Sequence, residues 1–150
     1  AQMKASHRDI SITTDIIVGF PGEAEEDFRE TVKLVEYCGY DSAYIFKYSP
    51  RPGTPAFEME DDVPAEEKTS RFRTLEQVQK IHQFNNLQRY LDRTLEVLAE
   101  RPSTKSPDHL TGHSTCHRVV NFKGSGDMLG TIVNVRITEV KSNSLFGEVV

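Results

Sequence analysis

Two loops rich in glycine and proline have the composition of ligand-binding loops. The first, residues 19–23 (GFPGE), follows the apolar run of residues 16–18 and precedes three acidic residues at 25–27. Glycine permits positive φ angles and close approach of the backbone to a ligand, whereas proline fixes φ and lacks an N–H donor. The second loop, residues 49–55, has three prolines within six positions, so little entropy is lost when it orders around a ligand. Either loop could also be a simple turn.

The elements around these loops indicate α/β structure. Residues 10–18 alternate β-branched side chains and end in a continuous apolar run, typical of a parallel strand that becomes buried on both faces. Residues 25–37 predict a helix with one apolar stripe, which ends at Gly39. Residues 41–48 are rich in aromatic residues and predict a second strand. Each loop would then follow the carboxyl end of a strand, where parallel α/β folds bind ligands.

A long helix is predicted from Pro64 onward, because proline favours the first position of a helix. Its apolar residues recur every three positions from Phe72 to Leu87, so the apolar stripe winds around the helix and should touch different partners along its length. The basic residues of this helix, Arg71 among them, are expected on a solvated face. At the other end of the chain, residues 1–8 predict the end of a preceding helix.

From Thr94 onward the pattern changes to short strands and turns. Strands are predicted at residues 95–98, 110–113, 118–122, 130–140 and 145–150, with a turn at residues 121–127. Five short strands in so few residues are typical of a small closed barrel, and such barrels often bind single-stranded nucleic acid. The sequence therefore predicts two domains, residues 1–93 and residues 94–150.

The composition is that of a globular protein. Of its 150 residues 37% are hydrophobic and 27% are charged, and no apolar run has membrane-spanning length. Two cysteines and the absence of a recognisable secretory signal make a reducing cytoplasm the expected location. Residues 1–93 carry the whole net charge of −5, with 12 Lys and Arg against 17 Asp and Glu, while residues 94–150 hold six of each. Neither part is basic enough for charge alone to indicate nucleic-acid binding.

Two segments resemble a known enzyme family. The sequences DIIVGFPGE (residues 15–23) and DSAYIFKYSPRPGTPA (residues 41–56) resemble consecutive strand-loop segments of the radical S-adenosylmethionine (SAM) methylthiotransferases, and of their MiaB-type branch in particular. That branch adds a methylthio group to an isopentenylated adenosine beside the tRNA anticodon. The resemblance implies a transferase that uses SAM and two 4Fe–4S clusters. It also implies that residues 1–93 are the last portion of a TIM-like radical SAM barrel with a long linking helix.

The resemblance assigns eight residues to the SAM pocket. The backbone at the end of the first strand would lie near the adenine with the Phe-Pro pair as a wall, and the end of the second strand would flank the base. Glu23 could brace the loop or place a charge at the helix terminus, and the structural role is expected. The expected cofactor-binding residues are Val18, Gly19, Phe20, Pro21, Glu23, Phe46, Tyr48 and Ser49.

The end of the chain carries a second resemblance. The sequences TGHSTCHRVVNFKG (residues 111–124) and LGTIVNVRITEVKSNSLFGEVV (residues 129–150) resemble the TRAM domain, an OB-like barrel that ends these enzymes and would bind the tRNA anticodon stem-loop. The stretch HRVVNF is closer to the tRNA-modifying branch than to the branch that modifies a ribosomal protein. Phe122 is a candidate for stacking on a base. The expected RNA-binding residues are Arg118, Asn121, Phe122, Lys123 and Arg136, although each cation alone could be an ordinary surface charge.

The residues that would hold the clusters are missing from this chain. The family uses three closely spaced cysteines for one cluster and three more upstream for the other, whereas this chain has only Cys38 and Cys116. His109, His113 and His117 recur every four residues, but side chains at that spacing do not align on strands, so no metal site and no catalytic residue are expected. The chain alone is therefore expected to be inactive and to be the C-terminal part of a longer protein.

Alternative interpretations remain open. A methylthiotransferase acting on threonylcarbamoyladenosine in tRNA or on a ribosomal protein would carry similar segments. A non-enzymatic RNA-binding module, with an α/β platform and a barrel, is a different class of function. A three-cysteine motif encoded upstream of residue 1 would favour the enzyme. No membrane partner is expected, the full-length protein is expected to be a monomer, and the sequence does not identify the electron donor.

Overall fold

The computed structural model describes residues 10–104 and 106–150, which form two compact units. One unit is Ile12–His82, and the other is Gln83–Val150 together with the described residues before Ile12. The helix end predicted for residues 1–8 lies outside the described residues. In chain order the elements are β1 (Thr13–Val18), α1 (Glu25–Cys38), β2 (Ser42–Lys47), the 3₁₀ turn η1 (Pro55–Glu58), α2 (Ala65–Gln88), β3 (Thr94–Pro102), β4 (His109–Ser114), β5 (Val119–Lys123), the 3₁₀ turn η2 (Gly126–Met128), β6 (Ile132–Val140) and β7 (Leu145–Val149).

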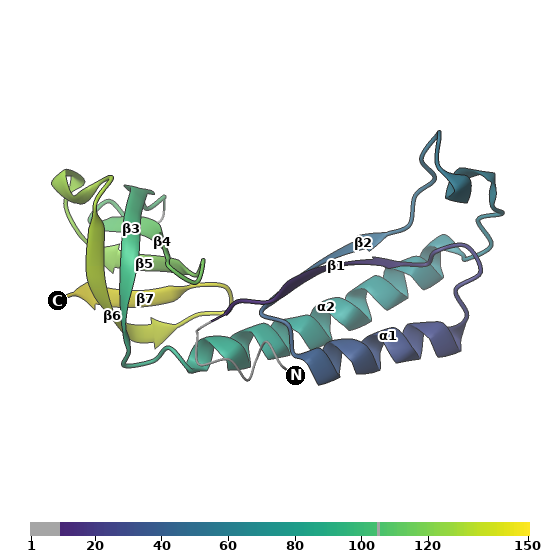
Figure 1. Cartoon of the computed structure of the whole chain (residues 1–150), viewed down its shortest axis with the longest axis horizontal. Helices are drawn as coiled ribbons and strands as arrows, with labels where there is room; N and C mark the ends of the chain where they lie inside the picture. The colour runs from purple at the N-terminus through teal and green to yellow at the C-terminus, as the bar shows by residue number, and fades with distance from the viewer. Residues whose placement is uncertain (1–9, 105) are drawn as a thin grey trace. The chain divides into compact units, whose positions relative to one another are not determined.

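The first unit is a two-stranded parallel sheet with helices on one side. β1 and β2 pair in parallel, with Val18 opposite Lys47 at their carboxyl ends. Figure 1 shows α1 and α2 along the same side of this sheet. The core between sheet and helices contains the buried residues Val18, Phe28, Val35 and Leu75. The predicted strand-helix-strand order and the apolar stripe of α1 are confirmed.

The opposite face of the sheet is open. Ile17 and Phe46 are partners in the strand register and are 53% and 52% exposed. The prediction that the first strand becomes buried on both faces is therefore wrong for this face. The physical reason is that the described residues supply helices for only one side of the sheet.

Among the described residues, no helix has both the length and the apolar character needed to cross a membrane.

Local sequence explains where α1 begins and ends. At its start, Asp27 Oδ2 accepts a hydrogen bond from the Ala24 N–H (2.9 Å), which satisfies a donor that the helix leaves unpaired. At its end, Gly39 adopts the left-handed conformation (φ 50°), and its N–H donates to the Val35 carbonyl (2.8 Å). Glycine has no Cβ to oppose this conformation, so the predicted helix terminator is confirmed.

The apolar residues of α2 pack in two different cores. Leu75 is fully buried with the sheet and α1, whereas Leu87 is buried in the core of the second unit. Between them Ile81 and Phe84 are exposed. The prediction that this helix touches different partners along its length is confirmed, and the three-residue spacing of its apolar positions is the cause.

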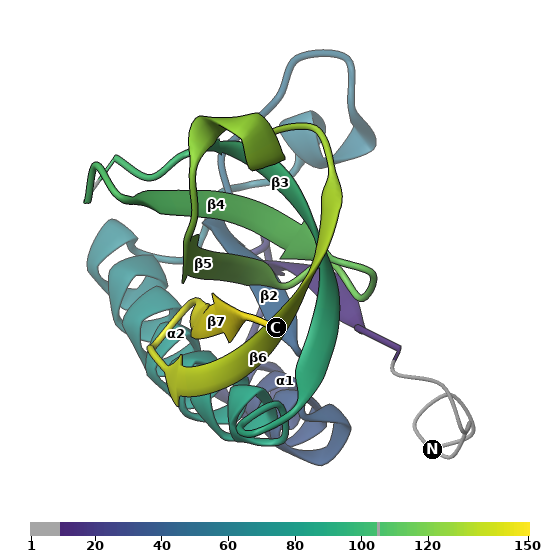
Figure 2. The same cartoon turned by 90° about the vertical axis from the view of Figure 1, so that its left-hand side faces the viewer.

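The second unit contains a closed five-stranded barrel, as the strand pattern predicts. The strand order is β3-β4-β5-β7-β6, and β6 pairs with β3 to close the ring. Neighbouring strands are antiparallel except for the parallel pair of β5 and β7 (Figure 2). The interior is apolar, with Val97, Val120 and Ile137 fully buried. The turn predicted for residues 121–127 is wrong in its first half, because residues 121–123 extend β5 and pair with β4.

Two glycines allow close contacts between barrel strands. A Cβ atom on Gly112 in β4 would overlap the carbonyl oxygen of Leu98 in β3, and one on Gly147 in β7 would overlap the carbonyl oxygen of Arg136 in β6. The partner in each case is backbone and cannot rotate away. A side chain at either position would therefore push paired strands apart.

We expect Gly112→Ala to lower the free energy of unfolding of the 150-residue chain by about 1–3 kcal/mol or more, because the added methyl group overlaps β3 backbone. Urea unfolding followed by circular dichroism measures the change. Gly126→Ala is the matched control, since a Cβ at Gly126 has no atom within 4 Å. Equal stabilities of the two variants would contradict the close packing of β3 and β4.

Candidate functional site

The two predicted loops lie side by side at the carboxyl ends of β1 and β2. The Tyr48 N–H donates to the Val18 carbonyl (2.8 Å), which continues the parallel pairing beyond the strands. The rings of Phe20 and Tyr48 pack edge to face, with their centroids 5.2 Å apart. The parallel register therefore brings together two segments that are separated by about thirty residues of sequence.

A cavity of about 440 Å³ opens beside these loops on the uncovered face of the sheet. Ile17 and Phe46 contribute apolar surface from opposite positions of β1 and β2. Phe20, Tyr48 and Ser49 line it from the loops. Its volume is in the range of small-molecule sites, which combine apolar walls with a few polar groups.

The carboxylate of Glu23 fixes the shape of the first loop. Its Oε2 accepts hydrogen bonds from the Gly19 N–H (2.6 Å) and from Arg71 Nη1 (2.6 Å). Arg71 Nη1 also donates to the Glu23 carbonyl (2.9 Å), and Arg71 Nε donates to Glu67 Oε1 (2.9 Å). Gly19 itself has a φ of 69°, which favours glycine. These contacts give Glu23 a bracing role within the loop.

Arg71 is 5% exposed, so its prediction as a solvated residue of α2 is wrong. Burial alone lowers the pKa of its guanidinium, but hydrogen bonds and charges from Glu23 and Glu67 outweigh burial and raise the pKa above its ordinary value. The arginine therefore stays charged and holds the loop to α2.

A second ion pair holds the same loop from the acidic segment before α2. Lys68 is buried, and its Nζ bonds to Asp61 Oδ1 (2.5 Å) and lies 5.2 Å from the centre of the Tyr48 ring. The side chain of Lys68 packs against Gly19, where an added Cβ would overlap it. Asp62 Oδ1 accepts from the Gly22 N–H (2.8 Å). No local pattern in the sequence identifies the partners of these carboxylates.

The eight residues predicted for the cofactor site fall into two groups. Phe20, Phe46, Tyr48 and Ser49 line the cavity. The other four lie behind it: Val18, Gly19 and Pro21 are buried, and Glu23 braces the loop. In the first loop, therefore, Phe20 faces the cavity, and the other predicted residues support the loop from behind.

Two of the residues predicted to bind RNA are buried. Phe122 is fully buried in the core, so its prediction as a stacking residue is wrong: neither face of its ring is open to a base. Arg118 is only 7% exposed and lies 5.8 Å from the centre of the buried Tyr90 ring. Its prediction as an RNA-contacting cation is corrected to a structural contact with Tyr90.

The other three predicted residues lie on two strands. Asn121 and Lys123 are on β5, whereas Arg136 is on β6, and β7 lies between these strands. Asn121 and Lys123 themselves line different cavities. Their assignment as RNA contacts stays a prediction.

Histidines 109 and 113 lie on β4, while His117 follows in a turn with a φ of 59°. The rings of His113 and His117 stack 4.6 Å apart, and His113 Nδ1 lies 2.9 Å from the Glu100 carboxylate. Within the described part of the chain, no group of three or more His, Cys, Asp and Glu residues could hold a metal ion.

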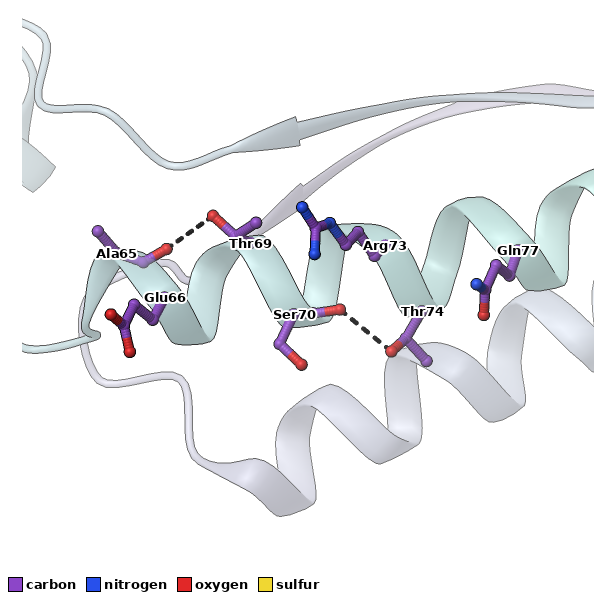
Figure 3. A pocket seen from close by; sticks show the side chains of 7 residues that line it. All are labelled: Ala65, Glu66, Thr69, Ser70, Arg73, Thr74 and Gln77. Carbon is purple, nitrogen blue, oxygen red and sulfur yellow. Dashed lines mark hydrogen bonds between the residues drawn. The ribbon is translucent and has the colours of Figure 1, made fainter.

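A further hollow of about 490 Å³ lies along α2 and lacks converging polar groups (Figure 3). The hydroxyls of Thr69 and Thr74 donate to the Ala65 and Ser70 carbonyls of the same helix. All the residues that line this hollow belong to α2: Ala65, Glu66, Thr69, Ser70, Arg73, Thr74 and Gln77.

We expect Glu23→Gln to destabilise the chain by about 1.5–3 kcal/mol, because it removes the charge from two short hydrogen bonds to buried groups. Glu30→Gln is the matched control: Glu30 pairs with Lys33, both side chains are about 70% exposed, and the loss should be under about 1 kcal/mol. Thermal unfolding of both variants measures the difference. Similar losses would show that the Glu23 contacts do not brace the loop.

Known proteins match both units of the chain. Residues 88–150 match the family model of the TRAM domain. The chain is 46% identical over 99% of its length to tRNA-2-methylthio-N(6)-dimethylallyladenosine synthase of Cronobacter sakazakii (31% of that protein), over 98% to that of Clostridium tetani (32%), and over 99% to that of Haemophilus influenzae (31%). It spans about a third of the length of these curated relatives. The resemblance to the tRNA methylthiotransferases is therefore confirmed over nearly the whole chain, and residues 88–150 are a TRAM domain.

Proposed function

We propose that the chain is the C-terminal part of a tRNA-2-methylthio-N(6)-dimethylallyladenosine synthase. The observation that carries this proposal is the 46% identity to enzymes of that name over 99% of the chain. In the full-length protein, residues 1–93 would form the last portion of a TIM-like radical SAM barrel, and residues 94–150 the TRAM domain. The parallel pairing of β1 with β2, with helices on one side only, supports the first assignment.

The cavity at the ends of β1 and β2 suits the adenosyl part of SAM. Ile17 and Phe46 offer a flat apolar surface, Phe20 and Tyr48 form a wall, and the Ser49 hydroxyl is a polar group at the rim. When bound, SAM would supply the methyl group and the radical chemistry of the reaction. The contribution of these residues is to orient the adenosyl group and to exclude water.

The clusters would be held by the remainder of the full-length protein. The chain has two cysteines, Cys38 in one unit and Cys116 in the other, whereas one cluster needs several converging thiolates. This chain alone would therefore be inactive. It would provide part of the SAM pocket and the TRAM barrel, which would bind the tRNA anticodon stem-loop in the cytoplasm.

Deleting the gene that encodes this chain should abolish 2-methylthio-isopentenyladenosine in tRNA and leave the isopentenylated precursor in its place. Mass spectrometry of nucleosides from total tRNA measures both. Methylthio-threonylcarbamoyladenosine should persist, which serves as the internal control. Unchanged 2-methylthio-isopentenyladenosine would overturn the proposed function, and a change in another methylthiolated product would reassign the substrate.

In the full-length protein we expect Phe46→Ala to weaken SAM binding about tenfold, because a half-exposed ring of the cavity is lost without opening the core. Isothermal titration with SAM measures the dissociation constant. Tyr37→Ala is the control, since Tyr37 is an exposed aromatic residue of α1 outside the cavity. Equal affinities of the two variants would remove the cavity from the cofactor site.

A further inference from the structure

One row of side chains crosses the outside of the barrel over three adjacent strands. Thr111 on β4 is opposite Asn121 on β5, which in turn is opposite Phe146 on β7. Their neighbours Leu110, Val120, Phe122 and Leu145 are buried inside, so the row belongs to the outward face. Figure 2 shows these three strands next to one another. The row lies in a cavity of about 670 Å³, here called the β5 groove.

The β5 groove contains an aromatic ring that the barrel core does not use. Phe146 is partly buried and lies outside the core cluster. Lys141 Nζ, from the turn that leads into β7, lies over the face of this ring, 5.8 Å from its centre, so a base that stacks on this face would displace the flexible lysine. Lys141 also forms an exposed ion pair with Glu139. An outward aromatic ring beside a lysine is the arrangement that stacks a nucleobase next to a phosphate.

Polar groups beside the ring are prepared for hydrogen bonding. The Thr111 hydroxyl donates to Asn121 Oδ1 (2.7 Å), which fixes the amide and leaves its NH₂ group to donate. His109 lines the same groove, and its Nδ1 is buried without a hydrogen-bond partner in the described structure. A buried polar atom without a partner is costly, so a ligand that supplies one would be favoured.

The charge of the groove contrasts with that of the chain. Its described lining includes Arg101 and Lys141 and no carboxylate, although the chain has a net charge of −5. The cavity that Lys123 lines, by comparison, includes Asp108. The β5 groove is therefore suited to an anion attached to a flat ring.

We propose that the β5 groove binds a single unpaired nucleotide of RNA. The base stacks on Phe146 and meets the Asn121 NH₂ group and His109 with its edge, while Arg101 and Lys141 contact the flanking phosphates. A base within a duplex cannot reach the ring, because its faces are covered by its neighbours. This inference rests on the proposed function in a tRNA-modifying enzyme, and it replaces the predicted contacts of Arg118 and Phe122 with a surface on β4, β5 and β7.

The test is fluorescence anisotropy of the full-length protein with a labelled anticodon stem-loop RNA, and with a fully paired RNA hairpin of the same length. We expect Phe146→Ala to weaken stem-loop binding about tenfold or more, with Phe146→Trp restoring it. Lys141→Ala should reduce the slope of log affinity against log salt by about 0.7, as loss of one phosphate contact does for single strands. Lys123→Ala and Arg136→Ala are matched controls outside the groove and should change affinity less.

Asn121→Asp keeps the oxygen that accepts from Thr111 but replaces the NH₂ donor with a negative charge. It should weaken binding without unfolding the barrel, which keeps the proposal testable if Phe146→Ala fails to fold. Normal stem-loop affinity in Asn121→Asp and in a folded Phe146 variant would overturn the inference, as would equal affinity of wild type for the paired hairpin. If wild-type protein binds no tRNA and the deletion strain keeps its 2-methylthio-isopentenyladenosine, the proposed function itself fails.

Discussion

The buried ion pair between Glu23 and Arg71 determines the shape of the loop after β1. The loop needs a positive φ at Gly19 and leaves the Gly19 N–H without a strand partner. Glu23 supplies that partner, and Arg71 neutralises the carboxylate, so a charge can be buried at little net cost. The pair joins residues 48 positions apart. The loop can therefore hold Phe20 against Tyr48 only when α2 is docked on the sheet.

Docking of α2 depends in turn on the spacing of its apolar residues. A strict 3.6-residue repeat would give this helix one apolar face and one partner. With a repeat of three, Leu75 faces the sheet and α1, while Leu87, more than three turns later, enters the barrel core. The exposed side chains between them, Ile81 and Phe84, mark the change from one core to the other. One helix thereby contributes to the support of the loop after β1 and to the interior of the barrel.

The sequence was informative where local pattern decides structure, and failed where a distant partner decides it. Strand and helix positions, the end of α1 at Gly39 and the closed barrel follow from periodicity and turn residues. In β5 the polar residues Asn121 and Lys123 alternate with the apolar residues Val120 and Phe122, so this period of two already predicts that Phe122 faces the core and Asn121 faces outward. Pairing with β4 and β7 places Phe122 inside and Asn121 outside. The pairing of Arg71 with Glu23, in contrast, joins residues 48 positions apart and could not be predicted from the local pattern.

The side chains that β5 directs outward also explain how an acidic chain could present the proposed RNA site. Charges on a protein surface act over about 8–10 Å at physiological salt, so the local set of side chains matters more than the net charge. The net negative charge is carried by residues 1–93, and the barrel residues are balanced. Within the barrel, strand register places Asn121 and Phe146 on the outer surface, and the β6–β7 turn brings Lys141 to the ring. The same alternation that buries Phe122 therefore creates the β5 groove.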